Sequence, residues 1–553
     1  MAPKDLRSFL AAIETSGDLV TTDKEIDWDL DVCALGRLSC ERGGPSILFR
    51  NVKDYGPDWP VLVNPVATWR RLAVAFGLPP DTSVPRLYQA YAEREQRPIP
   101  PVVVKDGPCK EVVIPGAKVD CFDLPVPMVH DGDGGRYLGT WDLVVSKDPA
   151  SGWVNWGMYR FMIHNERLLT GFPRPTSHLG KMFLDHYVPK KQPMPIAIAI
   201  GCDQPSHLAA ASTFRLGGSE AELAGGLGQQ AVELIRCETS ELHVPATSEI
   251  VVEAEVLPDR IAQEGPYGEY PGYRTGEMGH AICARVTAIT HRKRPIFTID
   301  TTGYMDSSSF VTTISGAIAI QRRLEKHGVP VVAVNVPPEG GVHLTIISVR
   351  RGGRAVAEQI LQTITARRAL MSKIIVVDED VDVFNLGQVL HAFATKCHPG
   401  TGIHVTHYEG RANTLTPCYS QAERVARSGA TVAFDATWPP EWPIETVPVR
   451  ATLDISDEEL ARSMQGQLKR MQDCGIDRLL FSPQAGAMGH HFGSPLVSRY
   501  WTEACNDLIA CAAKLFPEKI SPVCQLPQSP GVGPKEWVDE LDRCVKDLGF
   551  VGC

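Results

Sequence analysis

The amino-acid sequence predicts a multidomain α/β (α+β) protein in which helices and strands are mixed differently along the chain. Its 553 residues are enough for two to four domains of ordinary size. Hydrophobic residues make up 43% of the chain and charged residues 22%, which is usual for a globular protein. The pattern of predicted helices and strands changes near residue 112 and again near residue 310, and these changes set the expected domain boundaries.

Residues 1–112 are expected to form an N-terminal α/β domain. Helical patterns stand at DLRSFLAAIE, TWRRLAVAFG and VPRLYQAYAERE, and a short strand stands at SILFRNV. The segment ends in QRPIPPVVVKDGPCKE, whose prolines and charges are typical of a domain boundary.

Residues 113–310 are expected to be rich in β-strands. KEVVIP, TWDLVVSKD, VNWGMYRFMIHN, MPIAIAIG, EIVVEAEV and ICARVTAIT carry β-branched or alternating patterns. One helix is predicted over 219–238, with Ser219 as its N-cap and Glu222 completing a capping box. Many strands around few helices favour a barrel or a sandwich-like sheet.

Residues 311–505 alternate between strands such as HLTIISVR and helices such as RAVAEQILQTITARRALM. This alternation predicts a C-terminal α/β domain with a partly parallel sheet. Residues 506–553 are expected to form a helical tail with no role assigned to it.

Charge and composition exclude some classes of partner. A formal net charge of −10 argues against nucleic-acid binding. No stretch is long and apolar enough to span a membrane, and the N-terminus lacks a signal-peptide core. The 15 cysteines include no Cys-x-x-Cys pair, which favours reduced thiols in the cytoplasm.

Three polar residues of the β-rich part form a reasonable ligand set for a divalent cation. Asn155 lies in NWGMYR, His178 in TSHLG, and Glu220 in the first turn of the predicted helix. Oxygen and imidazole ligands of this kind suit Mn²⁺ or Mg²⁺. Each residue also has an ordinary interpretation: a turn cap, a core or surface histidine, and a carboxylate that stabilises the helix dipole. The residues alone leave both interpretations open.

The stretch EGPYGEYPGYR, residues 264–274, places two glutamates on a rigid loop. Its glycines and prolines restrict and turn the backbone, so Glu264 and Glu269 are expected at fixed offsets. Arg160 can pair with either glutamate as a plain structural ion pair. Two carboxylates beside an arginine can equally serve acid–base chemistry.

Five motifs follow one another along the chain: NWGMYR, TSHLG, EAELAGGLGQQAVELIRCE, VPATSEIVVEAEV and EGPYGEYPGY. Together, and in this order, they resemble the motifs of the UbiD family of reversible decarboxylases. SKIIVVDEDVDVFNLGQVLHAFATKCHPG extends the resemblance, which covers roughly residues 5–500 and is nearest to the branch acting on hydroxylated benzoates such as protocatechuate and gallate. It implies a central split β-barrel of the flavin-reductase kind. It also implies a C-terminal domain that dimerises and closes over the active site, in a homodimer or larger homo-oligomer.

The resemblance implies a cofactor and the residues that hold it. The cofactor is prenylated FMN, supplied by a flavin prenyltransferase, with Mn²⁺ (or Mg²⁺) at its phosphate and K⁺ nearby. The implied metal ligands are Asn155, His178 and Glu220. The implied cofactor-binding residues are Asn155, Trp156, Gly157, Met158, Tyr159, Arg160, Ser177, His178, Glu220 and Lys373, with Lys396 as a second candidate for the phosphate contact.

By the same resemblance the catalytic set is Arg160, Glu264 and Glu269. Arg160 would bind the substrate carboxylate, because its planar guanidinium matches two oxygens at once. Glu264 would orient Arg160, and Glu269 would deliver a proton to the carbon that loses CO₂. The implied reaction is the reversible decarboxylation of an aromatic acid through a covalent adduct with the cofactor.

Substrate identity is left open. Phenolic hydroxyl groups need hydrogen-bond partners, and the candidates from the sequence are His490, His491, His391, His398 and the histidines of HVTHYEG. A cinnamic-type acid is an alternative substrate. Two rival functions also fit the sequence: a flavin oxidoreductase with ordinary FMN, and a non-catalytic subunit of a decarboxylase complex.

Overall fold

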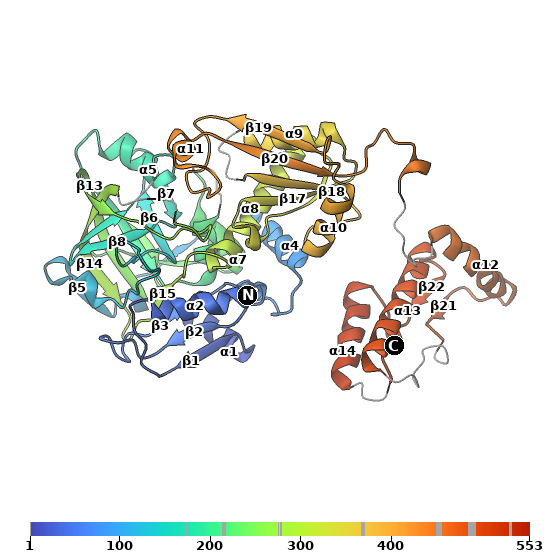
Figure 1. The fold of residues 1–553 in the computed structure, drawn as a ribbon. Helices are drawn as coiled ribbons and strands as arrows, with labels where there is room; N and C mark the ends of the chain where they lie inside the picture. The colour runs from blue at the N-terminus through green and yellow to red at the C-terminus, as the bar shows by residue number, and fades with distance from the viewer. Residues whose placement is uncertain are drawn as a thin grey trace. The chain divides into compact units, whose positions relative to one another are not determined.

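A computed structural model of the protein describes residues 2–171, 174–212, 217–274, 276, 279–366, 371–448, 456–484, 494–529 and 533–553. The described chain divides into two compact units, Met1–Glu445 and Thr446–Cys553. Figure 1 traces the helices and strands of both units. The mixed α/β architecture with several sheets confirms the predicted fold class. The boundaries expected at residues 112, 310 and 505 remain predictions.

The N-terminal part of the first unit is a four-stranded sheet with helices packed around it. The strand order is β1 (Leu19–Thr22), β2 (Ser46–Phe49), β3 (Val61–Val63), β15 (Phe297–Ile299). Its helices are α1 (Leu6–Thr15), α2 (Asp31–Glu41), α3 (Trp69–Ala75) and α4 (Val84–Glu95). Asp5 and Thr68 cap α1 and α3 with their side-chain oxygens, which explains where these helices begin. The fourth strand, β15, thus comes from a part of the chain far beyond residue 112 and completes this sheet.

An antiparallel sheet forms the centre of the first unit. Its order is β7 (Val154–Gly157), β6 (Asp142–Lys147), β10 (Met194–Ile200), β13 (Ile250–Glu264), β14 (Gly279–His291), β9 (Leu168–Gly171), β8 (Phe161–Asn165), and β5 (Val112–Pro115) also pairs with β14. Alternating apolar residues such as Ile196, Ile198 and Ile200 are fully buried or nearly so. The strands predicted from these patterns are therefore present.

The edges of this sheet come close together. β7 and β8 lie at opposite ends of the strand order, yet only Met158, Tyr159 and Arg160 separate them in the chain. Three residues reach only about 10 Å even when fully extended. The sheet must therefore curl until its two edge strands are neighbours, as in a split barrel, and Arg160 lies at the split.

A small sheet and three helices flank the split barrel. The sheet has the order β12 (His243–Pro245), β11 (Glu233–Arg236), β4 (Val102–Val103), and the helices are α5 (His178–Met182), α6 (Gln204–Ala211) and α7 (Glu220–Gly228). The helix predicted over 219–238 is wrong in length. Ser219 does cap α7, but α7 ends at Gln229 in the left-handed conformation (φ 58°), and the chain continues as β11. Gly225 and Gly226 lie against the backbone of residues 94–99, where a Cβ on Gly225 would be 2.4 Å from the Ile99 carbonyl oxygen.

The last part of the first unit confirms the predicted strand–helix alternation. Its sheet has the order β16 (Val331–Asn335), β17 (Leu344–Val349), β18 (Lys373–Asp378), β20 (Gly429–Ala436), β19 (Ile403–Tyr408), with β17, β18 and β20 parallel. The helices are α8 (Ser307–Lys326), α9 (Arg354–Thr365), α10 (Leu386–Lys396) and α11 (Gln421–Ala426). α9 and α10 cover opposite faces of the sheet (Figure 1).

The second unit has a β–α–β core. β21 (Leu479–Phe481) and β22 (Ile520–Pro522) are parallel and are joined by α13 (Pro495–Leu515). Helices α12 (Asp457–Asp473) and α14 (Pro534–Asp542) flank them. In both units, the described helices include none that is long and apolar enough to cross a bilayer.

Candidate active site

A cavity of about 1250 Å³ opens in the first unit. Its wall is built from the connection between β7 and β8, the EGPYGEYPGYR loop, α8, and the segment around α11. Arginines dominate the charged lining: Arg160, Arg174, Arg274, Arg323, Arg424 and Arg427. Three acidic residues, Asp142, Glu264 and Glu269, share the wall with them. A cavity with this surplus of cations suits an anionic ligand.

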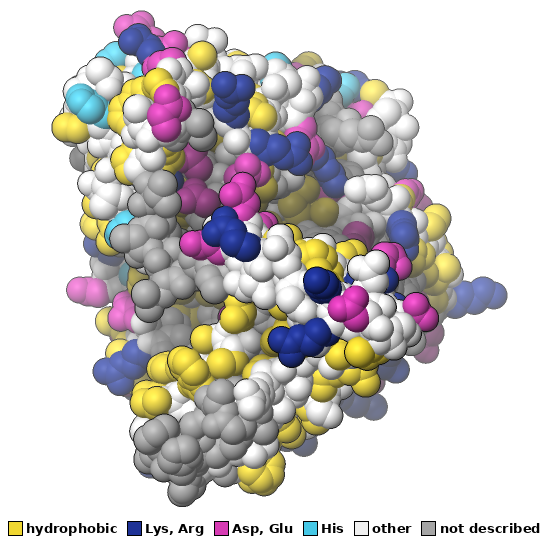
Figure 2. All heavy atoms as spheres, turned by 90° about the vertical axis from the view of Figure 1, so that its right-hand side faces the viewer, with side chains coloured by type: hydrophobic (Ala, Val, Ile, Leu, Met, Phe, Trp, Pro, Cys, Tyr) yellow, Lys and Arg dark blue, Asp and Glu magenta, His cyan; other side chains and the backbone are white. Residues whose placement is uncertain are grey.

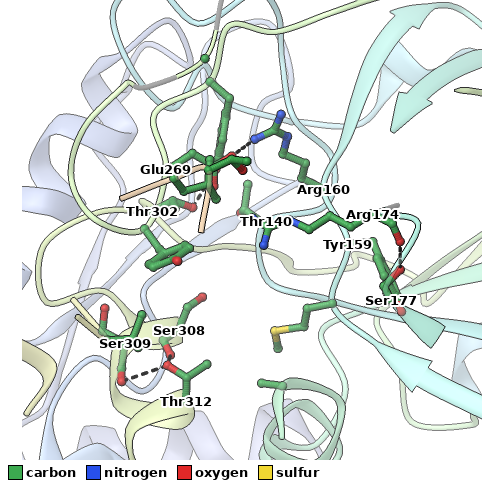
Figure 3. Close-up of a pocket in the computed structure, with 18 of the residues that line it drawn as sticks. Thr140, Tyr159, Arg160, Arg174, Ser177, Glu269, Thr302, Ser308, Ser309 and Thr312 are labelled. Carbon is green, nitrogen blue, oxygen red and sulfur yellow. Dashed lines mark hydrogen bonds and ion pairs between the residues drawn. The ribbon is translucent and has the colours of Figure 1, made fainter. Parts of the chain in front are cut away.

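Arg160 lies at the split of the barrel and contacts both glutamates of the loop. Its Nε and Nη2 atoms donate to Oε1 and Oε2 of Glu264, each over 3.1 Å. Its Nη1 atom donates to Oε1 of Glu269, as Figure 3 shows. Glu264 is the last residue of β13, whereas Glu269 follows on the loop. The structure thus brings together the three residues that the resemblance assigns to catalysis.

A glycine-rich segment before β6, residues 130–137, contacts and supports the EGPYGEYPGYR loop; it is called the brace below. The backbone N–H of Gly134 donates to the Pro266 carbonyl (2.8 Å), and the Asp133 carboxylate accepts from the Gly268 N–H (2.8 Å). A Cβ on Gly134 would lie 1.9 Å from the Gly265 carbonyl oxygen, so only glycine permits this approach. This segment was not predicted from the sequence, although its HDGDGGRY pattern is a signal of close backbone contact.

Two tyrosines complete the surroundings of Arg160. The Tyr137 hydroxyl donates to Oε1 of Glu264 (2.8 Å), and the Tyr137 and Tyr267 rings are 4.3 Å apart between centroids. The guanidinium carbon of Arg160 lies 5.2 Å from the centre of the Tyr267 ring. Tyr267 in turn donates to the Thr302 hydroxyl (2.7 Å). These contacts fix the arginine and one glutamate without any ligand.

The three predicted metal ligands lie around the start of α5 and α7. His178 Nδ1 is 2.9 Å from the Asn155 Oδ1 atom, and Oε2 of Glu220 accepts from the Trp156 N–H (3.2 Å). Ser177 caps α5 and thereby holds His178 at the first helical position. The His178 imidazole thus contacts the Asn155 side chain, and the Glu220 carboxylate contacts the backbone of the next residue, Trp156.

The chemistry of this cluster fits a divalent cation. Burial raises the pKa of Glu220 to about 7, although the backbone N–H of Trp156 stabilises the carboxylate in part. Burial lowers the pKa of His178, which keeps the imidazole neutral and able to coordinate. The Asn155 Nδ2 atom is buried without a hydrogen-bond partner in the described structure. The described residues contain no cluster of three or more His, Cys, Asp and Glu side chains suited to a metal, so an asparagine would be needed to complete the set.

The other predicted cofactor-binding residues fall into two groups. Met158, Tyr159, Arg160 and Ser177 line the cavity, whereas Trp156 and Gly157 lie behind it in buried positions. Lys373, at the start of β18, donates to the Ser372 hydroxyl (3.0 Å). Lys396 is held by Asp378 (3.1 Å) and Asp380 (3.2 Å). Neither lysine lines the described cavity, and their phosphate contact remains a prediction.

Hydroxyl groups line the wall opposite the arginine. Ser308, Ser309 and Thr312 of α8 lie across the cavity from Arg160 and Glu269 (Figure 3). The histidines proposed from the sequence do not: His391, His398, His404 and His407 are absent from the described lining. His490 and His491 lie outside the described residues. The histidines remain candidate phenol partners from the sequence, which does not single out the α8 hydroxyls.

Known proteins share this architecture over most of the chain. Residues 10–91, 102–305 and 309–436 match the N-terminal, Rift-related and C-terminal domains of 3-octaprenyl-4-hydroxybenzoate carboxy-lyase. The segment 404–553 also matches an amidohydrolase family.

Individual relatives and solved structures agree with these matches. Pyrrole-2-carboxylic acid decarboxylase of Pseudomonas aeruginosa is 32% identical over 460 residues, which cover 79% of this chain and 92% of that protein. The UbiD-class enzyme HmfF from Pelotomaculum thermopropionicum, solved with FMN, superposes with a TM-score of 0.72 at 28% identity over 83% of this chain and 99% of that one. Vanillic acid decarboxylase of Sedimentibacter hydroxybenzoicus, in its open form, gives 0.72 at 28% identity over 85% and 100%. The chain therefore belongs to the UbiD family of carboxy-lyases, the family that its motifs resemble.

Proposed function

We propose that this enzyme reversibly decarboxylates a hydroxylated aromatic acid on a prenylated flavin. The observation that carries the proposal is the position of Arg160, held between two carboxylates in the wall of a cavity. The relatives named above act on pyrrole-2-carboxylic and vanillic acids, and one binds FMN, which supports an aromatic acid and a flavin here. When bound, prenylated FMN supplies the electron sink that loss of CO₂ from an aromatic ring requires.

Arg160 receives the substrate carboxylate. Glu264 already occupies Nε and Nη2, so the substrate binds at Nη1 and takes the place of Glu269 there. Once it has left the cation, the Glu269 carboxylate takes up a proton from solvent, because Arg160 no longer stabilises its charge. The exchange of partners therefore readies the acid at the moment the substrate arrives.

Glu269 then delivers the proton. The bond between the ring carbon and the carboxylate breaks, CO₂ leaves, and the Glu269 proton moves to the ring carbon. The products are the arene, CO₂ and the Glu269 carboxylate, so charge and atoms balance. The reverse sequence, with Glu269 as base, carboxylates the arene.

The hydroxyl side chains of α8, called the α8 wall, determine which substituted ring the cavity accepts. Ser308, Ser309 and Thr312 offer oxygen atoms that can hydrogen-bond ring hydroxyls, opposite the group that binds the carboxylate. A hydroxylated benzoate satisfies both ends of the cavity. A cinnamic-type acid is the second candidate, because one without ring hydroxyls would leave the wall without partners.

Asn155, His178 and Glu220 would hold Mn²⁺ or Mg²⁺ at the cofactor phosphate, with K⁺ nearby. The neutral imidazole of His178 and the buried carboxyl group of Glu220 support this assignment. His178→Ala should therefore lower the metal and flavin content of the purified protein, measured by elemental analysis and absorbance. His164→Ala is the control, because that histidine is exposed on β8. Full flavin and metal in His178→Ala would contradict the assignment.

Partners and location follow from the same proposal. A flavin prenyltransferase would supply the cofactor, and the enzyme would work in the cytoplasm as a homodimer or larger homo-oligomer. Positive and negative side chains are interspersed on the face shown in Figure 2, which gives no support to nucleic-acid binding.

The test is hydrogen–deuterium exchange on a panel of aromatic, heteroaromatic and cinnamic acids. The full-length protein is co-expressed with a flavin prenyltransferase, and a parallel preparation contains ordinary FMN alone. The carbon that bears the carboxylate holds no hydrogen in the acid, so exchange is scored in the corresponding arene. Deuterium at that carbon of the arene reports the proton transfer even when equilibrium favours the acid. We expect exchange with hydroxylated benzoates only in the prenylated preparation. No exchange with any acid, at full cofactor loading, would instead favour a non-catalytic subunit.

A further inference from the structure

The two glutamates beside Arg160 are not equivalent, and Tyr137 makes the difference. Tyr137 is fully buried and precedes β6. Its hydroxyl donates to Oε1 of Glu264 over 2.8 Å, the same oxygen that accepts from Arg160 Nε. Glu264 therefore receives three donors: two guanidinium nitrogens and one phenol.

The contacts of Glu269 differ in kind. Its side chain accepts from Arg160 Nη1, and its backbone N–H donates to the Tyr273 carbonyl (3.2 Å). Both residues line the cavity and both side chains are largely buried (6% exposed for Glu264, 13% for Glu269), but Glu264 ends a strand, whereas Glu269 lies on the loop. The structure thus gives one carboxylate a fixed set of donors and leaves the other with a partner that a substrate can replace.

Tyr137 is suited to act only as a donor here. Burial, followed by the neighbouring Glu264 charge, raises the pKa of the Tyr137 phenol, so its proton stays in place. Its ring is fixed against Tyr267, which also faces Arg160. The titratable and charged groups that face Glu264 are thus Arg160, Tyr137, Tyr267 and, across the arginine, Glu269.

We propose that Tyr137 is a positioning residue that holds the Glu264 carboxylate in place on Arg160, so that Glu269 is the glutamate whose contact with Arg160 a substrate can replace. The proposal rests on the proposed function and extends it to a residue outside the Arg160–glutamate set. Loss of the phenol hydroxyl removes one of the three donors to Glu264, and a hydrogen bond to an ionised carboxylate stabilises the ionised form.

The test compares Tyr137→Phe with Tyr187→Phe in the holoenzyme. Tyr187 belongs to the same buried cluster, and its hydroxyl donates to the Lys147 carbonyl (3.2 Å), away from the cavity lining. In Tyr137→Phe we expect kcat for exchange to fall about 10-fold or more, and the acidic limb of its pH profile to move up by about one pH unit. Tyr187→Phe should change neither quantity.

A second measurement does not depend on activity. Infrared titration follows the carboxyl band of Glu264, assigned with Glu264→Gln, and the midpoint should rise in Tyr137→Phe. An unmoved midpoint and an unmoved acidic limb would overturn the proposal, even if the variant were less stable or less active. If the wild type exchanged no acid, the proposed function would fail, while the infrared shift would still decide the role of Tyr137.

Discussion

The first unit contains two pairs of neighbouring, largely buried carboxyl groups, and the charge of each pair is stabilised in a different way. Glu264 and Glu269 share a cation, Arg160. Asp300 and Asp306 stand at the N-terminus of α8, where backbone N–H groups and a serine hydroxyl hold them: Asp300 accepts from Ser308 N and Oγ (2.9 and 2.7 Å), and Asp306 accepts from Ser309 N (2.7 Å). Within the described residues no ion pair joins this second pair to a cation.

The difference separates the acid that we propose to be reactive, Glu269, from a structural one, Asp306. Burial, followed by the charge of Asp300, raises the pKa of Asp306, so this pair of carboxyl groups favours holding a proton. Yet Asp306 is absent from the cavity lining, whereas Glu269 lines it. A raised pKa alone therefore does not identify a catalytic acid; its position beside the substrate does.

Neutralising one acid in each pair gives the largest expected contrast. Glu269→Gln should retain flavin and metal but lower the exchange rate by about 10²–10⁴-fold, because the amide cannot supply a proton. Asp306→Asn, the matched change in the other pair, should keep turnover within about threefold, because asparagine also caps a helix. Full activity in Glu269→Gln would remove Glu269 from the mechanism.

The brace offers a second way to disturb the Arg160 pair. Gly134→Ala should lower the free energy of unfolding by about 1–3 kcal/mol and reduce turnover, because its Cβ would overlap the Gly265 carbonyl. Gly279→Ala is the control, since a Cβ there meets nothing within 4 Å although Gly279 pairs with Glu264. Thermal unfolding and exchange rates check both. Equal behaviour of the two variants would show that the brace has no role.

The α8 wall should affect substrate choice more than chemistry. Thr312→Val should raise KM for a hydroxylated benzoate by about 5–10-fold, the effect of one lost hydrogen bond, and leave the unsubstituted acid unchanged. Steady-state kinetics on the two acids measures the ratio. An equal rise in KM for both acids would show that the ring hydroxyls bind elsewhere in the cavity.

The pH dependence of stability should reveal the Asp300–Asp306 pair. The folded pKa of Asp306 lies above the ordinary value of 3.8, so the folded state binds the proton more tightly. Its contribution to stability is therefore full below about pH 4 and is lost as pH rises through the folded pKa. Asp306→Asn should flatten this decline, seen as a smaller fall in Tm as pH rises from about 4 to about 8. A decline as steep as that of the wild type would contradict the assignment.

Much of the fold could be predicted from local patterns, because period-2 and period-3.6 repeats reflect burial on one face. The exception at α7 arose where Gly225, Gly226 and Gln229 ended a helix that the apolar pattern continued into β11. Arg160 and the loop glutamates were placed together by resemblance, since 104 residues separate Arg160 from Glu264. The brace and the α8 wall were not foreseen, because contacts such as Gly134 with Gly265 depend on how distant strands curl.

The separation of α8 from the end of β13 also bears on how such enzymes diversify. The wall hydroxyls are supported within their own neighbourhood: Thr312 Oγ1 donates to the Ser308 carbonyl (2.7 Å), and Ser308 Oγ donates to Asp300. Arg160 and its glutamates depend instead on β13 and the brace. In the proposed mechanism, mutations in the α8 wall would therefore change which ring is accepted without disturbing proton delivery, and a lineage could adopt new acids while it keeps the same chemistry.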